Sequence, residues 1–186
     1  GSLDMERVMG AALKTVAGVP ERDVRAWTES WFDGDVAQHA APGAWPFLEA
    51  HAASGHPRVL LTSSSPYASK KAVELFGLED FLCTRFEVHE GEFTGKLELP
   101  VCFGDGKVAL AERYAEEHAI DLDRSWFYTD SMTDLPMLER VGHPVVVHPD
   151  PRLKRHAARK GWPVLDWHSD DTPQAAKLLA VLKAAA

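Results

Sequence analysis

The sequence has little cysteine, no long apolar run and a deficit of basic charge, and each shortage excludes a class of protein. Its 186 residues include two cysteines, Cys83 and Cys102, without a C-x-x-C partner, which excludes a disulfide framework and a thiolate zinc site. No apolar run approaches the roughly 20 residues that a bilayer-spanning helix needs, and no signal-peptide core is present. We therefore expect a cytoplasmic protein with two buried, reduced thiols.

Acidic side chains outnumber basic ones. The chain has 20 Lys and Arg against 28 Asp and Glu, a net charge of −8, and no dense block of Lys and Arg is evident. This balance disfavours general binding to nucleic acids or to anionic membranes, so neither is an expected partner. At roughly 150 residues per domain, the length predicts one core with a small appended element.

The first third of the chain predicts helices. Residues 4–16 and residues from about 21 to 34 repeat apolar side chains at i, i+3 and i+4, and a third helix opens near Pro42 and ends at Gly55. Trp27 and Trp31 share a stripe of the second helix. We expect both indole rings to pack against neighbouring elements.

From residue 58 onward, short apolar runs alternate with helical segments. The runs 58–62, 125–129, 144–148 and 163–167 predict strands buried in a parallel sheet. Residues 86–89 and 92–97 alternate around Glu90-Gly91 and predict a β-hairpin. Because the connections fit βαβ crossovers, the predicted fold class is α/β, a doubly wound parallel sheet.

Candidate binding residues follow two of the predicted strands, where ligands of such sheets bind. Thr62 and Ser63 end the first strand and open a helix, so hydroxyl and backbone N–H groups there could hold a phosphate. The alternative is that the serines of this segment only cap the helix. Asp130 and Asp134 follow the second strand and suit a hard cation such as Mg²⁺, unless Asp134 only caps the next helix.

Lys107 is a third candidate. It lies in the first turn of a predicted helix, where a cation opposes the helix dipole by a few tenths of a kcal/mol unless an anion lies nearby. A lone lysine at such a position is more often a solvated side chain. Residues 104–109 imitate a dinucleotide-binding G-x-G-x-x-A, but Pro100 and the poor βαβ context speak against it. The histidines, which lack the spacing of metal ligands, are predicted to be surface or packing residues.

The order Thr62, Lys107, Asp130, Asp134 resembles the haloacid dehalogenase superfamily of phosphohydrolases, specifically its phosphoserine-phosphatase-like branch with a helical cap. The resemblance covers roughly residues 7–162. Residues 55–64 look like the second family motif, Gly106-Lys107 looks like the third, and residues 128–136 with 144–150 form the most specific stretch. The resemblance implies a partial helical cap over residues 1–41 and a core over residues 42–186.

The same resemblance implies a role for each candidate residue. Thr62 and Ser63 would bind the phosphoryl group, and Lys107 would neutralise charge on the phosphate and on the nucleophile. Asp130 would bind Mg²⁺, and Asp134 would brace the metal's water shell or the lysine. The implied substrate is a small phosphorylated metabolite, hydrolysed through an aspartyl-phosphate intermediate.

The sequence departs from the family at the first motif, D-x-D-x-T/V, which supplies the nucleophile. No such motif precedes Thr62, and Asp33-Gly34-Asp35 lies in a segment that reads as helical. We expect the nucleophile strand to be missing, either because the chain is a fragment, as the tag-like Gly1-Ser2 suggests, or because it is an inactive domain that binds phosphate or a partner. Whether the chain is an enzyme stays open. A missing central strand would expose two strand edges and favour a dimer or a complementing segment.

Overall fold

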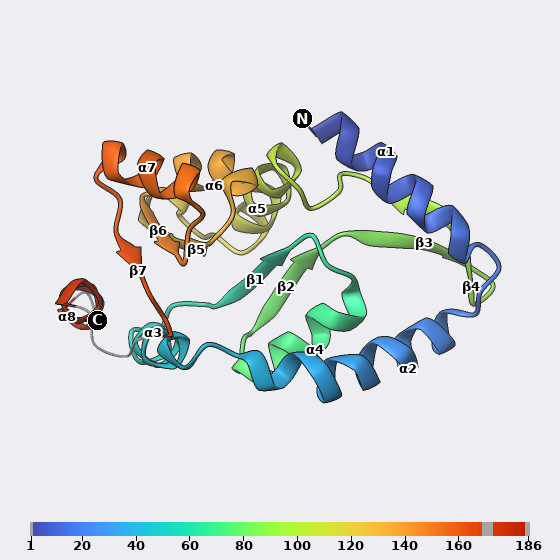
Figure 1. Cartoon of the computed structure of the whole chain (residues 1–186), viewed down its shortest axis with the longest axis horizontal. Coiled ribbons are helices and arrows are strands. Elements are labelled where there is room, and N and C mark those ends of the chain that lie inside the picture. Colours follow the sequence, from blue (N-terminus) through green and yellow to red (C-terminus); the bar gives the residue numbers. More distant parts are fainter. Residues whose placement is uncertain (1, 169–172, 185–186) are drawn as a thin grey trace. The chain divides into compact units, whose positions relative to one another are not determined.

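The computed structural model of the protein describes residues 2–168 and 173–184 and divides into two compact units (Figure 1). Unit 1 comprises residues 1–39 and 59–111, and unit 2 comprises residues 40–58 and 112–186. The two units are defined by how compactly the chain packs, whereas the expected boundary at residue 41 separates a helical cap from a core. That division therefore stays a prediction.

Unit 1 combines a parallel strand pair, a β-hairpin and helices. Strands β1 and β2 pair in parallel with Thr62 opposite Cys83, and β3 and β4 pair antiparallel. The elements are α1 (Ser2–Leu13), α2 (Glu21–Trp31), β1 (Val59–Thr62), α4 (Pro66–Phe76), β2 (Asp80–Cys83), β3 (Arg85–His89), β4 (Glu92–Glu98) and α5 (Asp105–Glu117), which ends in unit 2.

Local sequence signals explain where several of these elements begin and end. Glu90 and Gly91 have φ angles of 50° and 82°, so both residues of the hairpin turn are left-handed, as a two-residue turn between twisted strands requires. Ser65 Oγ accepts a hydrogen bond from the Ala68 N–H at 3.3 Å and caps α4, which ends at Gly77. The predicted hairpin and the predicted helix after Ser65 are confirmed.

Unit 1 also differs from expectation at two places. Strand β2 was not predicted, because its four residues do not alternate and run directly into the hairpin. The expectation that Trp27 and Trp31 pack is wrong, since their exposed fractions are 64% and 53%. Helix α2 instead meets α4 through another stripe, on which Glu21 accepts a hydrogen bond from the Tyr67 hydroxyl at 3.2 Å.

Unit 2 is a three-stranded parallel sheet in the order β5-β6-β7 with helices on both faces. Val145 and Val147 of β6 pack with residues of α3 and α8, whereas Val146 between them packs with residues of α6 and α7. This alternation confirms the predicted α/β class with helices on both sides of a parallel sheet. The elements are α3 (Trp45–Ala53), β5 (Trp126–Thr129), α6 (Leu135–Arg140), β6 (His143–Val147), α7 (Pro151–Lys160), β7 (Val164–Leu165) and α8 (Pro173–Ala184).

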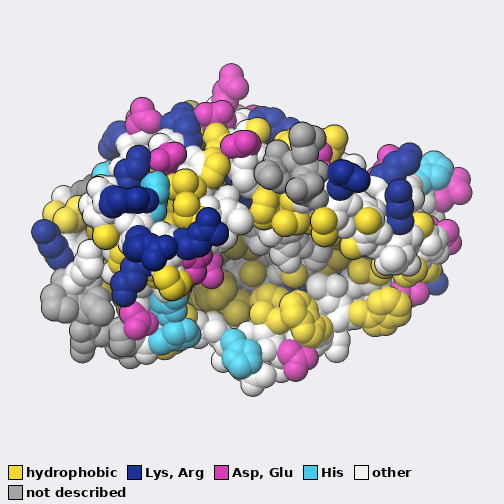
Figure 2. All heavy atoms as spheres, turned by 45° about the horizontal axis from the view of Figure 1, so that its top comes forward, with side chains coloured by type: hydrophobic (Ala, Val, Ile, Leu, Met, Phe, Trp, Pro, Cys, Tyr) yellow, Lys and Arg dark blue, Asp and Glu magenta, His cyan; other side chains and the backbone are white. Residues whose placement is uncertain are grey.

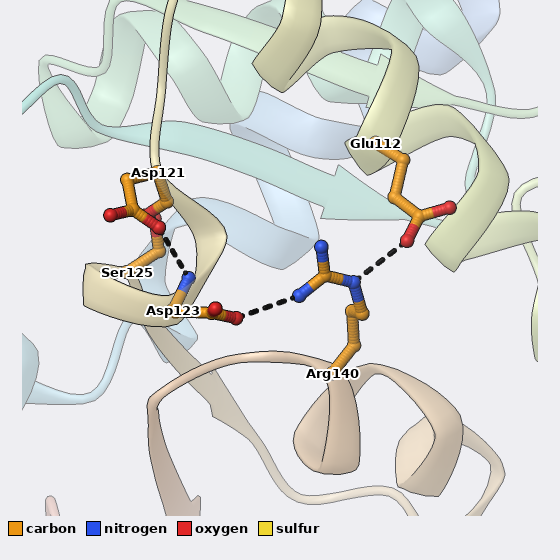
Figure 3. Close-up of polar contacts among 5 residues, drawn as sticks. All are labelled: Glu112, Asp121, Asp123, Ser125 and Arg140. Carbon is orange, nitrogen blue, oxygen red and sulfur yellow. Dashed lines mark hydrogen bonds and ion pairs between the residues drawn. The ribbon is translucent and has the colours of Figure 1, made fainter.

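An arginine connects three segments of unit 2 (Figure 3). Arg140 Nε donates to Glu112 Oε1 at 2.7 Å, and its Nη1 donates to Asp123 Oδ1 at 3.0 Å. Gly142 lies against the same turn, because a Cβ there would stand 1.7 Å from the Asp123 carbonyl oxygen. The second half of α5, the turn Leu122–Arg124 and α6 are thus held together at one place.

Both cysteines are free and buried, as expected. Burial raises the pKa of the Cys83 thiol, which keeps it protonated at neutral pH. Across the described ranges, every helix is too short or too polar to cross a bilayer.

Candidate functional site

The loop between β1 and α4 carries the first two candidates. Thr62 is the last residue of β1, and its Oγ1 accepts a hydrogen bond from the Ser64 N–H at 3.2 Å. Ser63 and Ser64 are exposed, whereas Ser65 is occupied as the cap of α4. One serine therefore caps the helix, as the alternative interpretation expected, and the exposed serines precede the positive end of an 11-residue helix.

Lys107 occupies the first turn of α5 and is 7% exposed. The residue before it, Gly106, approaches the backbone so closely that a Cβ would lie 2.0 Å from the Val101 carbonyl oxygen. The neighbouring Cys102 donates its backbone N–H to Thr84 Oγ1 at 3.2 Å, directly after β2. Because β2 pairs with β1, the segment leading to Lys107 is anchored at the edge of the sheet where β1 ends.

The loop after β5 carries the two carboxylates. Thr129 ends β5, its Oγ1 accepts from the Ser131 N–H at 3.2 Å, and it donates to Asp134 Oδ2 at 2.7 Å. Ser131 Oγ accepts from the Thr133 N–H at 3.3 Å and so closes the next turn. Asp134 is 4% exposed, whereas Asp130 faces solvent.

The alternative that Asp134 only caps the next helix is not what the structure shows. Its side chain makes no capping hydrogen bond at the start of α6, and it is held by Thr129. The structure therefore brings Asp130 and Asp134 together in one loop of unit 2. Thr62, Ser63 and Lys107 belong to unit 1.

The carboxylates fit a magnesium site only in part. Within residues 2–168 and 173–184, no group of three or more His, Cys, Asp or Glu side chains is arranged to hold a metal ion. Mg²⁺ is commonly held by one or two carboxylates, with waters and phosphate oxygens completing its shell. The exposed carboxylate of Asp130 fits such a role, whereas one oxygen of Asp134 already binds Thr129.

Sequence reasoning missed two features near β5. Thr129 was not a candidate, although a hydroxyl residue also ends β1. The second feature is a buried polar chain, in which His51 Nδ1 lies 3.0 Å from His56 Nδ1 and His51 Nε2 lies 2.9 Å from the Tyr128 hydroxyl. Burial, helped by the charges of His56 and Arg58, lowers the pKa of His51 to about 4, so this histidine is neutral at pH 7.

Asp33 and Asp35 lie in the helical turn Phe32–Val36, which directly follows α2. Lys71 pairs with Asp33 at 2.8 Å between Nζ and Oδ1. The expected helical character of this segment is confirmed, and neither aspartate follows a strand.

Comparisons with known proteins identify the family of this chain. A sequence model of the haloacid dehalogenase-like hydrolases matches residues 1–139. A probable phosphatase of Mycobacterium tuberculosis is 31% identical over 163 residues, which cover 88% of this chain and 56% of that protein. The chain spans about half the length of the curated relatives that it matches first.

Solved structures share the fold. A Bordetella pertussis protein of unknown function aligns with a TM-score of 0.80 and 27% identity, covering 87% of this chain and 74% of that one. A substrate-bound phosphoserine phosphatase aligns with a TM-score of 0.65 and 19% identity, covering 93% of this chain and 76% of that one, which is a likeness of fold alone. With three quarters of its length matched by the family model, the chain belongs to the haloacid dehalogenase-like hydrolases.

Proposed function

We propose that this chain carries the phosphate- and metal-binding residues of a Mg²⁺-dependent phosphohydrolase of small phosphomonoesters. The observation that carries the proposal is the burial of Lys107, which is 7% exposed in the first turn of α5. A cation in this turn opposes the helix dipole, which is positive at the same end. A bound phosphate would be attracted by both the ammonium group and the helix terminus, and would turn that repulsion into a shared interaction.

The other residues take roles that suit their surroundings. Thr62 and Ser63 would donate hydroxyl hydrogen bonds to the phosphoryl oxygens from the end of β1. Asp130 would hold Mg²⁺, which supplies charge neutralisation at the transferring phosphate. Asp134, held by Thr129, would fix the shape of the loop and brace the metal's water shell or Lys107.

Aspartyl-phosphate chemistry also needs a nucleophilic carboxylate beside the phosphate. Asp33 and Asp35 are unsuited, because they lie in a helical turn. We propose that a strand outside residues 1–186 supplies the nucleophile. The alternative is a domain that binds phosphate or a partner without turnover, which the position of these aspartates equally favours.

The unpaired edges of β1 and β5 support a complementing segment or a dimer as a further part of this proposal. Among the residues that the structure describes, β1 pairs with β2 alone and β5 pairs with β6 alone. Open edges on parallel strands invite pairing. A complementing segment or a second copy would pair there, and light scattering would then show a mass that rises with concentration or with an added strand peptide. A monomer whose β1 and β5 amides are all protected from hydrogen exchange would contradict this.

Two measurements test the function together. The first is the intact mass of the purified protein, and the second is hydrolysis of p-nitrophenyl phosphate with and without Mg²⁺. Mg²⁺-dependent turnover by a species heavier than the 186-residue chain supports the phosphatase with its nucleophile in an added segment. No turnover at the mass of the chain favours the binding domain.

Site variants test the residue assignment independently of turnover. Lys107→Ala and Asp130→Asn should abolish Mg²⁺-linked phosphate binding in calorimetry while the circular dichroism spectrum stays unchanged. Unchanged binding in both variants would overturn the site. The reduced thiols Cys83 and Cys102 agree with the cytoplasmic location that we propose for such an enzyme.

A further inference from the structure

Helix α7 concentrates positive charge in an acidic chain. Its ten residues, 151–160, contain five of the 20 Lys and Arg residues and no Asp or Glu. In the sequence, apolar residues and a histidine divide these side chains into short groups, so that no dense basic block is evident. Figure 2 shows Lys and Arg side chains gathered at the left of the view, the side on which Figure 1 draws α7.

Folding sorts the residues of α7 onto two sides. Leu153 and Ala157 are fully buried against the sheet of unit 2. Successive residues of an α-helix are turned by about 100°, which places Arg152, Arg155 and Arg159 in a row on the side opposite Leu153 and Ala157. Along the helix axis, these arginines are about 4.5 Å and about 6 Å apart. All three are exposed, as are Lys154 and Lys160, which flank the row.

Little of this charge is neutralised within the protein. Lys160 pairs with Glu139 of α6 at 3.0 Å between Nζ and Oε1. The Asp150 carboxylate is engaged at the helix start, where it accepts from the Arg152 and Leu153 N–H groups at 2.6 and 3.0 Å. In the described part of the chain, the guanidinium groups of the arginine row form no ion pair.

Helix stability explains only part of this charge, since Arg159 and Lys160 lie in the last turn of α7, where a cation stabilises the helix dipole. Arg152 lies in the first turn, where a cation opposes the helix dipole. The acidic capping residue Asp150 already stabilises this end, and its backbone hydrogen bonds hold its pKa below the usual range. Arg152 and Arg155 also attract the Asp150 carboxylate, yet five basic residues on one ten-residue helix exceed what the helix itself needs, which points to a function outside the protein.

The composition of the face distinguishes among anionic partners. Recognition of nucleic acid usually adds Ser, Thr, Asn or Gln donors that fix the register on phosphates, or aromatic rings that stack on bases. The exposed face of α7 offers only Arg, Lys, Pro151 and Ala158. It also lacks large exposed apolar side chains that would insert into lipid. Attachment to a fluid bilayer requires neither polar donors in fixed register nor inserting apolar side chains, because anionic lipid headgroups can diffuse toward the basic residues.

We propose that α7 docks the protein peripherally onto a bilayer surface that contains anionic lipids. Each basic side chain near such a surface contributes about 1 kcal/mol. Among the described residues, four of the five basic side chains of α7 form no ion pair, and four such contributions suffice for reversible attachment. The net charge of −8 does not prevent this, because a Debye length of about 8 Å screens charges on distant parts of the surface. This proposal departs from the expectation of no membrane partner and is independent of the proposed hydrolysis.

The test is co-sedimentation of the purified chain with vesicles of phosphatidylcholine, with and without phosphatidylserine. We expect binding only to vesicles that contain phosphatidylserine, and weaker binding at higher salt. The triple variant Arg152→Ala, Arg155→Ala, Arg159→Ala should bind about 100-fold more weakly, which is about 3 kcal/mol at 1.4 kcal/mol per tenfold change.

A matched triple variant controls for the loss of three charges. The control variant removes three exposed arginines outside α7 through Arg22→Ala, Arg113→Ala and Arg124→Ala. It should bind to the vesicles like the parent chain. Circular dichroism checks that both variants fold. Equal binding to the two vesicle types, equal loss in the two triple variants, or preferential binding to duplex DNA or RNA over vesicles would each overturn the proposal.

Discussion

The loops that follow β1 in unit 1 and β5 in unit 2 are built in the same way but present opposite chemistry. Each strand ends in a threonine whose Oγ1 accepts from the N–H two residues later, at 3.2 Å in both loops. Each loop then uses a serine cap and a proline in the first turn of the next helix. The first loop offers only hydroxyls and N–H groups, whereas the second offers carboxylates. In the site that we propose, the same backbone arrangement would therefore present an anion-binding loop in unit 1 and a cation-binding loop in unit 2, depending on the side chains that it carries.

The two units should differ most in their response to acid, because unit 2 contains His51, whose pKa is lowered to about 4 from 6.5. The unfolded chain takes up a proton there near pH 6.5, whereas folded unit 2 resists protonation until about pH 4. Stability of unit 2 should therefore fall by up to about 3 kcal/mol across this window as the pH drops, and level off below it. Hydrogen exchange of peptides from each unit, from pH 7 to pH 4, measures the difference.

Two histidine variants separate this cause from general acid sensitivity. His51→Gln should flatten the pH dependence of unit 2, even though it lowers stability at pH 7. His118→Gln removes an exposed histidine and should leave the dependence intact. An unchanged slope in the His51 variant would show that another group titrates.

Substitutions of the two carboxylates in the loop after β5 should have different effects, one on stability and the other on binding. Asp134→Ala should cost about 2 kcal/mol of unfolding free energy, because it removes a buried acceptor and leaves the Thr129 hydroxyl unsatisfied. Asp130→Asn, at an exposed position, should change stability by less than about 0.5 kcal/mol and still lose Mg²⁺-linked phosphate binding. Urea unfolding gives both values, and equal costs would contradict the division of roles.

The two strand-ending threonines allow a direct comparison of the loops. Thr129→Val should cost about 1.5 kcal/mol, because it breaks the loop contact and also the bond to buried Asp134. Thr62→Val breaks only the loop contact and should cost about 0.5 kcal/mol. Should Thr62→Val prove the more costly, the first loop must hold interactions beyond this contact.

The serine caps should give the smallest difference. Ser65→Ala removes the cap of an 11-residue helix and should cost about 1 kcal/mol. Ser131→Ala removes the cap of a three-residue turn and should cost less than half as much. Thermal unfolding of both variants at pH 7 measures the difference, and a larger loss for Ser131→Ala would reverse the expected ranking.

The sequence predicted the α/β class because apolar runs, Ser-Pro helix starts and glycine stops all agree along the chain. It did not predict β2, whose register with β1 is a long-range contact that four residues cannot signal. The tryptophans of α2 misled because hydrophobic character was taken to mean burial, whereas that helix contacts α4 through a stripe that includes Glu21, the acceptor of the Tyr67 hydroxyl of α4.

For the candidate site, too, the sequence indicated which residues to consider but not the contacts that the fold makes between distant residues. Thr62, Ser63, Lys107, Asp130 and Asp134 could be named as candidates from their places at strand ends and helix starts and from the family resemblance, and their roles stay predictions. Local sequence could not reveal that Thr129 holds Asp134, or that Gly106 must be glycine because Val101 lies against it. Such facts depend on which backbone atoms the fold brings together.

The exposure of Trp27 and Trp31 also has a spectroscopic consequence. They are the tryptophans of unit 1, whereas Trp45, Trp126, Trp162 and Trp167 of unit 2 are all partly buried. Emission that an aqueous quencher such as iodide removes easily should therefore come mainly from unit 1, and protected emission from unit 2. The native protein thus contains its own pair of optical reporters, and unfolding of each unit can be followed in one sample without a label.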